Sequence, residues 1–469
     1  MVFHPQNLTK KDGAFIFSST VCASANPCMG KDIIKELWYN YSCQCSTLEV
    51  KEADGFVFAV GNASLPELCG MEYAINIEKD GIAVCAADEK SLIQAYMTLL
   101  DMFKPIDRDN DGLEIKLECA QIRERALIDN RMIHFCVFPE TELWELKRFL
   151  RACAALKYSH VIIEFWGTLR FDCMPELGWK NAFTKDEVRP ILNEARELGL
   201  EIIPMLNHWG HAAFSRGMQG KHVVLDQNIS LVTYFSENGW RWAIQKEKVK
   251  KLLRAARNEL IELCGEGKYF HIGCDEADGF THSKEDMDFI CDFLNEVARE
   301  LNESGRRAIA WGDMLIHNHD SYNKDNSYIC HAPSKEKEAY MLEHLDKSII
   351  IADWQYGAKK APVETSLALK NAGFDVLICP WDDSVKNIEA CINTAKSAPL
   401  FGFIHTTWHT LSRGMWLVPY LAIGSYEDLA ARPMDTPSYA AYVLRRVFNC
   451  GGDYAKAGWS KKQIDDVTT

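Results

Sequence analysis

Short apolar runs alternate with amphipathic stretches along most of the chain, and this alternation limits the fold more than any other feature. Eight runs of strand length lie at residues 126–129, 160–165, 201–206, 269–273, 308–311, 348–353, 375–379 and 402–407. Between them, apolar residues recur at helical spacing over residues 142–156, 185–198, 246–264 and 284–301. Alternating strands and helices form parallel sheets with right-handed crossovers. The pattern therefore predicts a (β/α)8 TIM barrel over residues 121–469, with a C-terminal helical extension. A doubly wound open sheet is the alternative, although no Gly-x-Gly-x-x-Gly follows any run.

Residues 1–120 predict a separate, small α/β domain before the barrel. Alternating apolar residues on either side of Asp80-Gly81 indicate a β-hairpin. Asp88 is a suitable N-cap for the next helix, in which Leu92, Tyr96 and Leu99 share one apolar face. Nothing in this part of the chain indicates catalysis, so a packing role is expected.

Composition excludes several classes of partner. Lys and Arg total 52 against 66 Asp and Glu, a formal charge of −14, which disfavours nucleic acid and anionic membranes. The start lacks a secretion signal, and no apolar stretch approaches the roughly 20 residues that span a bilayer. The 17 cysteines are scattered without a Cys-x-x-Cys pair, which favours reduced thiols in the cytoplasm. The oligomeric state is open, and a homodimer is one alternative.

Polar and aromatic residues gather at the predicted carboxyl ends of the strands, where TIM-barrel active sites lie. The candidate substrate-binding residues there are Arg131, Glu164, Asn207, His211, Trp311, Asp313, Trp354, Tyr356, Trp381, Asp383 and Trp408. Aromatic rings stack on the C–H face of a sugar, while carboxylates and amides bind its hydroxyls. A single Trp is more often a core residue. Six at strand ends follow the barrel rule, however: Trp166, Trp209, Trp311, Trp354, Trp381 and Trp408. The pattern predicts a carbohydrate substrate.

Two adjacent carboxylates, Asp275 and Glu276, follow the apolar run at residues 269–273. Adjacent side chains on an extended segment point to opposite sides, so the two acids meet different environments. One carboxyl can then stay protonated while the other stays ionised, which is the usual arrangement for acid-assisted bond cleavage. An exposed Asp-Glu pair in a turn is the alternative interpretation of these two residues alone.

The segment His271-Ile272-Gly273-Cys274-Asp275-Glu276 resembles the His-x-Gly-x-Asp-Glu signature of family 20 glycoside hydrolases, the β-N-acetylhexosaminidases. Residues 72–103 are similar to the helix-backed sheet that precedes the barrel in many members. Residues 125–129, 203–211, 310–314 and 406–408 are similar to the family's first, third, fifth and eighth strands. The nearest relatives by this resemblance are the intracellular members that lack a secretion signal.

This resemblance implies a retaining, exo-acting enzyme that hydrolyses terminal β-linked N-acetylhexosamine, GlcNAc or GalNAc, by substrate-assisted catalysis. In that family the acetamido oxygen of the sugar attacks the anomeric carbon, which is an exception to the two-carboxylate scheme. Glu276 is then the general acid and base, and Asp275 holds the acetamido N–H and stabilises positive charge. Trp311, Trp354 and Trp408 wall the ring, and His211 and Asn207 support the pair. No cofactor and no metal ion is implied.

The chain departs from the family pattern at several positions. Asn207 stands where many members have Asp, and Thr410 stands where many have an acid. The hydroxyl-binding Arg of the family corresponds to Arg131 in one alignment, whereas a second alignment places Ile133 there. The residue that binds the acetamido oxygen is either Tyr356 or Trp381. The sugar and the linkage are therefore less certain than the hydrolytic chemistry, and a different sugar specificity on the same fold is an alternative.

Two further hypotheses come from other classes of protein. A metal-dependent barrel hydrolase would use His208, His211 and His271 together with acids at strand ends, because these residue types bind zinc or manganese readily. A carbohydrate-binding barrel without catalysis would not need the Asp275-Glu276 pair, which is intact.

Overall fold

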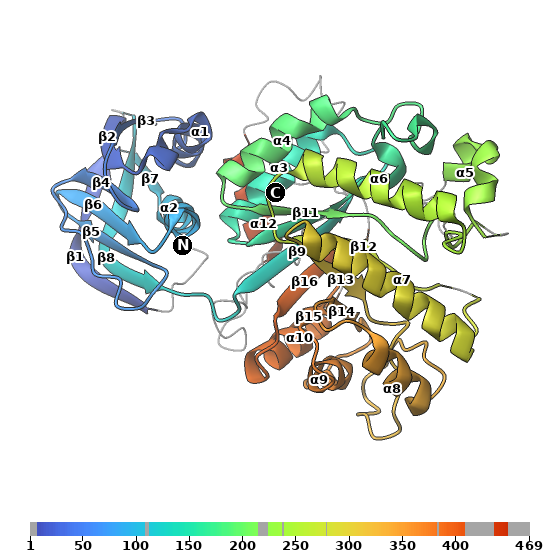
Figure 1. Ribbon diagram of the computed structural model, residues 1–469. Helices are drawn as coiled ribbons and strands as arrows, with labels where there is room; N and C mark the ends of the chain where they lie inside the picture. The colour runs from blue at the N-terminus through green and yellow to red at the C-terminus, as the bar shows by residue number, and fades with distance from the viewer. Residues whose placement is uncertain are drawn as a thin grey trace.

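The computed structural model describes residues 7–107, 112–213, 224–236, 239–277, 279–381, 384–408 and 436–448. It contains a mixed sheet at the N-terminal end and a closed barrel of parallel strands, which are seen separately in Figure 1. The candidate residue Asp383 and the departure at Thr410 lie outside the described residues. No helix among those described is long and apolar enough to cross a membrane.

The N-terminal sheet has the strand order β1-β8-β5-β6-β4-β2-β3, with β7 paired to β8. Its strands are β1 Asn7–Phe17, β2 Ser19–Ala25, β3 Ser46–Glu52, β4 Val57–Gly61, β5 Tyr73–Glu78, β6 Gly81–Ala86, β7 Lys104–Asp107 and β8 Leu113–Glu124. The helices α1 (Asp32–Tyr41) and α2 (Glu89–Asp101) belong to the same part of the chain. The predicted hairpin is β5–β6, and Asp88 caps α2 by accepting a hydrogen bond from the Ser91 N–H at 2.8 Å.

The barrel closes through eight parallel strands, which confirms the predicted fold class. They are β9 Asn130–Cys136, β10 His160–Glu164, β11 Glu201–Met205, β12 Tyr269–Gly273, β13 Arg307–Trp311, β14 Ile350–Trp354, β15 Val376–Cys379 and β16 Gly402–Thr407. Closure occurs where β16 pairs with β9, with Gly402 opposite Asn130. A Cβ atom at Gly402 would lie 2.2 Å from the Asn130 carbonyl oxygen, so this contact requires glycine.

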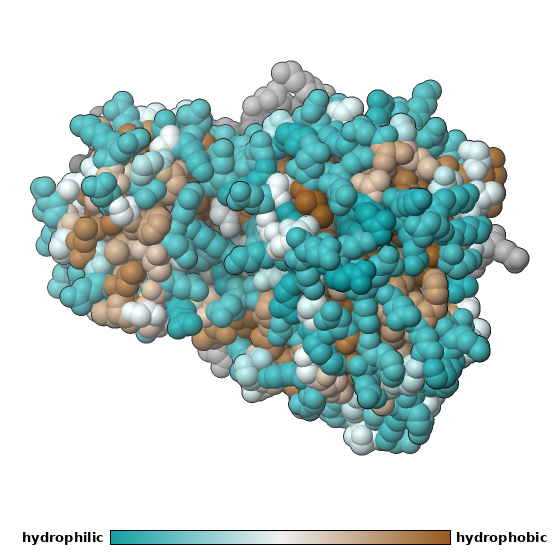
Figure 2. Space-filling view, in the orientation of Figure 1, coloured by the Kyte–Doolittle hydropathy of each residue, from teal (hydrophilic) through white to brown (hydrophobic). Residues whose placement is uncertain are grey.

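Helices surround the barrel strands and keep their polar sides outward (Figures 1 and 2). They are α3 Leu143–Ala155, α4 Lys185–Glu197, α5 Val224–Gln227, α6 Glu247–Cys264, α7 Lys284–Glu303, α8 Lys335–His344, α9 Glu364–Asn371, α10 Val385–Ser397 and α12 Thr436–Val447. The four predicted helical stretches correspond to α3, α4, α6 and α7. At the carboxyl end of α12, Arg148 and Arg151 of α3 donate to the Leu444 and Val447 carbonyls at 3.1 and 3.0 Å. Cations at this end complement the helix dipole.

The first barrel strand lies later in the chain than the sequence predicts. Residues 125–129 are irregular, and β9 begins only at Asn130. Leu127 is 51% exposed, so the predicted apolar run does not form a buried strand. Residues 125–129 connect β8 to β9 instead. The apolar residues of this connection give it the sequence pattern of a short strand. The correction moves the carboxyl end of the first strand from residues 129–131 to Cys136.

We propose that the two sheets form separate domains. The N-terminal sheet continues to the end of β8 at Glu124, a few residues beyond the predicted boundary at residue 120. A buried ion pair joins the two sheets, because Lys157 of the barrel lies 2.7 Å from the Glu124 carboxylate of β8. The Lys157 ammonium also donates to the Tyr73 hydroxyl at 2.8 Å. A buried pair of this kind favours one relative placement of its two partners.

Candidate active site

Close backbone packing shapes the turn that carries the two acids. Gly273 has φ +66, and a Cβ there would lie 1.6 Å from Asn207 Oδ1. A Cβ at Gly210 would lie 2.0 Å from the Asp275 carbonyl oxygen. Cys274 and Glu276 also have positive φ values, 81° and 42°. Such strained conformations persist where the surroundings hold them, and they cluster at functional sites. The two glycines therefore let the loop after β11 pack directly under the acids.

Asp275 and Glu276 meet different environments, as the sequence predicts. The Asp275 side chain is 8% exposed and that of Glu276 is 39% exposed. His211 lies between them, with its Nε2 atom 3.4 Å from Asp275 Oδ2 and 3.2 Å from Glu276 Oε2. Asp275 Oδ1 is buried without a hydrogen-bond partner among the described residues. One imidazole therefore contacts both acids, and one carboxylate oxygen is left to receive a donor.

Asp313, at the end of β13, holds this turn from below. Its Oδ2 atom accepts a hydrogen bond from the Glu276 backbone N–H at 2.9 Å and lies 3.0 Å from His331 Nδ1. Its Oδ1 atom accepts from the Trp354 indole at 3.0 Å. The hydrogen bond to Asp313 also raises the pKa of His331. Because Asp313 is fully buried, it links the turn to β14 rather than facing solvent.

Electrostatics separate Asp275 from an ordinary aspartate. Burial raises the pKa of its carboxyl, His211 lowers it, and the charges of Asp313 and Glu276 raise it again, giving a pKa of about 7. A carboxyl with a raised pKa is neutral below that value and ionised above it. Any role that needs the ionised Asp275 carboxylate is consequently lost as the pH falls below about 7.

Replacing His211 by Ala should move the acidic limb of the kcat/KM profile to higher pH. The imidazole lowers the pKa of Asp275, so its removal leaves burial and the neighbouring carboxylates unopposed. The acidic limb reflects the coupled titration of Asp275 and Glu276. The pH at its midpoint is therefore compared between the wild type and the variant. Initial rates of the wild type and the variant across a pH series measure it. An unchanged midpoint would mean that His211 does not lower the pKa of Asp275.

Aromatic side chains from four strand ends lie around the acids. The Trp311 and Trp408 ring centroids are 5.6 Å apart, and those of Trp354 and Tyr356 are 5.2 Å apart. The Trp381 ring is 5.4 Å from that of Tyr356. The Tyr356 hydroxyl accepts a hydrogen bond from the Trp408 indole. The structure therefore brings all five predicted aromatic residues into one group.

Glu164 and Asn207 also lie together, at the ends of β10 and β11. The Asn207 amide donates to Glu164 Oε1 at 3.0 Å, and its backbone carbonyl accepts from the Trp242 indole at 2.9 Å. Asn207 is thus hydrogen-bonded to Glu164 and does not form the charged partner of His211 that an aspartate could supply. Glu164 is 1% exposed.

Arg131 does not lie with the other candidates, and the prediction that it binds sugar hydroxyls is wrong on geometric grounds. It is the second residue of β9, at the opposite end of the barrel from the acids. Its guanidinium donates to the carbonyls of Lys157, Ile128 and Asp129 at 2.9, 2.9 and 3.1 Å. The error follows from placing the first strand too early in the chain.

Sequence reasoning missed three residues near the catalytic turn, of which one contacts the turn and two contact its neighbours Asn207 and Asp313. Trp240 donates an indole hydrogen bond to the Glu276 carbonyl, and its ring lies 4.5 Å from that of His211. Trp242 binds the Asn207 carbonyl, and His331 binds Asp313. The alternation of Trp240 and Trp242 outside any predicted strand was the only sequence feature that set these two residues apart. His331 follows no strand and carried no signal.

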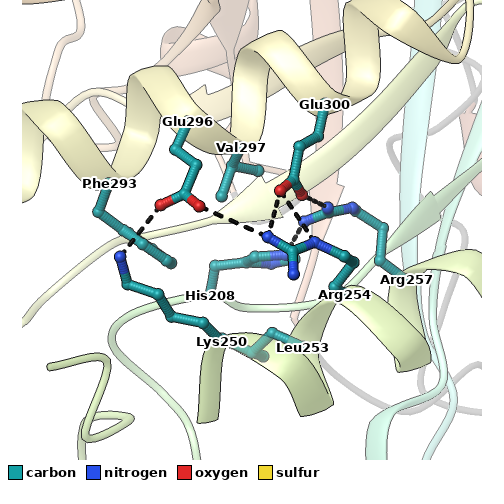
Figure 3. Close-up of a pocket in the computed structure, with 9 residues that line it drawn as sticks. All are labelled: His208, Lys250, Leu253, Arg254, Arg257, Phe293, Glu296, Val297 and Glu300. Carbon is teal, nitrogen blue, oxygen red and sulfur yellow. Dashed lines mark hydrogen bonds and ion pairs between the residues drawn. The ribbon is translucent and has the colours of Figure 1, made fainter. Parts of the chain in front are cut away.

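The histidines of the metal-hydrolase hypothesis do not converge. His208 faces helices α6 and α7, where its Nε2 atom lies 3.2 Å from Arg257, which also pairs with Glu300 (Figure 3). Burial and the Arg257 charge lower the pKa of His208 to about 3. Within the described ranges, the one group with metal-ligand spacing is His134, Cys136 and Glu164, which contains none of the three histidines.

A carboxylate pair and an aromatic group at the strand ends of a closed parallel barrel are typical of glycoside hydrolases. The family model described as Glycosyl hydrolase family 20, catalytic domain, matches residues 166–384. These residues match a family 20 catalytic domain, and the protein is a β-N-acetylhexosaminidase-like glycoside hydrolase.

Similar proteins agree with this assignment. Hexosaminidase D of Bos taurus is 24% identical over 318 residues, which are 61% of this chain and 83% of that protein. A solved exo β-N-acetylglucosaminidase of Vibrio harveyi has a TM-score of 0.68 at 14% identity, covering 100% of this chain and 78% of its own. A β-hexosaminidase of Streptomyces plicatus, solved with GlcNAc, has a TM-score of 0.65 at 13% identity, covering 98% and 96%. At these identities the structural likeness establishes the fold.

Proposed function

We propose that the chain is a retaining, exo-acting β-N-acetylhexosaminidase that removes terminal β-linked GlcNAc or GalNAc by substrate-assisted catalysis. One observation carries the proposal. The buried Asp275 Oδ1 has no hydrogen-bond partner among the described residues, while the neighbouring Glu276 is partly exposed. A buried acceptor beside an accessible acid suits a substrate that brings its own N–H donor, as a 2-acetamido sugar does.

In the first step the enzyme supplies the general acid and the substrate supplies the nucleophile. Glu276 protonates the leaving oxygen while the acetamido oxygen attacks the anomeric carbon, so the glycosidic bond breaks as the new C–O bond forms. Asp275 accepts the acetamido N–H and stabilises the positive charge that develops. Glu276 then takes a proton from the water that opens the oxazolinium ring. Two inversions at the anomeric carbon return the β configuration.

The aromatic group supplies recognition in this proposal. Trp311, Trp354 and Trp408 surround the sugar ring and its acetamido methyl. Tyr356 is the better candidate for the acetamido oxygen, because its hydroxyl accepts a hydrogen bond from the Trp408 indole and keeps its own proton to donate. Burial, and less strongly the Asp275 charge, raises the pKa of Tyr356, so this proton stays in place. Trp381 then extends the aromatic surface beside Tyr356. Asn207 binds a sugar hydroxyl, and Glu164 holds the Asn207 amide in place.

A panel of p-nitrophenyl β-glycosides tests the proposal. The enzyme should hydrolyse the 2-acetamido glycosides and leave the glucoside and galactoside almost untouched, because only the former carry the internal nucleophile. NMR of the first-formed sugar should show the β anomer. Equal activity on glycosides without the acetamido group, or an initial α product, would overturn it.

Activity should survive dialysis against EDTA. The acid, the aspartate and the acetamide together supply the chemistry, and none of them needs a divalent ion. Rates before and after dialysis, on an acetamido substrate, measure this directly. Activity lost with EDTA and restored by zinc or manganese would favour the metal-dependent hydrolase instead.

We propose a reducing compartment for the protein, in agreement with the cytoplasmic location that the sequence predicts. Support comes from the cysteines, because every described one is a free thiol, including the exposed Cys22 and Cys69.

A further inference from the structure

We propose that His134, Cys136 and Glu164 form a binding site for a zinc-like divalent cation inside the barrel, separate from the catalytic pair. His134 and Cys136 lie on the same side of β9 at its carboxyl end, and Glu164 ends the adjacent strand β10. The mechanism proposed above uses neither His134 nor Cys136. The inference does not rest on the proposed function, because it concerns metal binding and not turnover.

The three donor atoms are spaced like three corners of a tetrahedron around zinc. Cys136 Sγ lies 3.5 Å from Glu164 Oε2 and 3.8 Å from His134 Nε2. His134 Nε2 lies 3.6 Å from Glu164 Oε2. Zinc bonds of about 2.0–2.3 Å at tetrahedral angles separate S, N and O ligands by roughly 3.3–3.7 Å. A zinc ion can therefore reach all three atoms with only small side-chain shifts.

The ligand types favour a borderline or soft cation over calcium or magnesium. Imidazole and thiolate are typical zinc ligands, whereas calcium and magnesium prefer oxygen atoms alone. Three protein ligands also leave the fourth tetrahedral position for water, which is the usual composition of an open zinc site.

The surroundings orient these ligands. The Asn207 amide donates to Glu164 Oε1 at 3.0 Å, which turns the other carboxylate oxygen toward His134 and Cys136. Outer hydrogen bonds of this kind position metal ligands. The Trp408 ring, 4.6 Å from the His134 ring, lies next to the site and is only partly buried. All three ligands are themselves buried, so only the fourth position of a bound ion would remain for a water molecule.

The competing explanation is a buried group without a metal, in which the Cys136 thiol and His134 only form hydrogen bonds with the Glu164 carboxylate. The two explanations differ in proton balance. When zinc binds, the Cys136 thiol gives its proton to solvent as the Zn–S bond forms, so affinity rises with pH. A hydrogen-bonded group without a metal role has no such affinity to measure.

Metal titration of matched cysteine variants separates the two. Wild type, Cys136→Ala and Cys379→Ala are stripped with EDTA, loaded with Zn²⁺, freed of excess ion and analysed for metal. Cys379 is the control, because it is fully buried at the end of β15 and belongs to no group with metal-ligand spacing among the described residues. We expect about one more zinc ion per chain in the wild type and Cys379→Ala than in Cys136→Ala. Loss of the thiolate should weaken binding by at least the roughly 10–100-fold that loss of an outer-shell partner costs.

Cobalt gives an independent readout. Co²⁺ bound at the site should show a thiolate-to-metal charge-transfer band that is present in Cys379→Ala and absent in Cys136→Ser, which keeps the side-chain size. Equal zinc content in the wild type and Cys136→Ala would overturn the proposal. So would a thiolate–cobalt band that survives in Cys136→Ser, because the other cysteines would then be the ligands.

Discussion

Glu276→Gln should lower kcat/KM for substrates with poor leaving groups by about 10²–10⁴-fold, the usual contribution of a general acid. The reason is chemical, because a carboxamide cannot protonate the departing oxygen. The loss should be much smaller for p-nitrophenyl glycosides, whose leaving group needs little protonation. Comparing a natural disaccharide with the p-nitrophenyl glycoside in the same variant measures the difference.

The control is Glu343→Gln, which makes the same chemical change at an exposed residue of α8. It should behave like the wild type on both substrates. Circular dichroism should show the Glu276→Gln variant to be folded. Wild-type turnover of the disaccharide by folded Glu276→Gln would remove Glu276 from the role of general acid.

Asp275→Asn should lower kcat by roughly 10²–10³-fold, the effect commonly seen when one preorganised electrostatic partner is lost. Asparagine keeps the size of the side chain but removes the charge that stabilises the forming oxazolinium. Because this interaction strengthens in the transition state, KM should change little. Steady-state kinetics on an acetamido substrate provide both parameters.

Two inhibitors test the mechanism behind this loss. A thiazoline analogue of the intermediate should bind the wild type tightly and Asp275→Asn poorly. If Asp275 were instead a covalent nucleophile, a 2-fluoro sugar should trap it as a glycosyl ester. Mass spectrometry showing that adduct, with no inhibition by the thiazoline, would contradict substrate-assisted catalysis.

The pH dependence adds a constraint that the sequence could not supply. Adjacent acids on an extended segment were expected to differ, and Asp275 is indeed more buried than Glu276. Burial, however, acts on Asp275, the acid whose ionised form the mechanism requires. His211 opposes that shift. The balance depends on side chains from different strands, and no local pattern reveals it.

The local sequence was sufficient to predict those elements whose structure depends on a single segment of the chain. The alternation of apolar runs predicts seven of the eight barrel strands and four of the helices within a few residues. The turn after β12 places Asp275 and Glu276 at a strand end, and the parallel barrel brings the other strand ends to the same side. Periodicity and turn chemistry act over short distances, so they can be predicted from the chain alone.

The start of the first strand and the contacts across the barrel were decided only by tertiary structure. Closure against β16 sets β9 at Asn130, which places Arg131 at the far end and His134 beside Glu164. Long-range packing likewise brings Trp240 to Glu276 and His331 to Asp313. These contacts join residues far apart in sequence, and they depend on how the strands register around the closed barrel. The sequence by itself determined the kind of site and its two acids, whereas barrel closure determined which residues surround them.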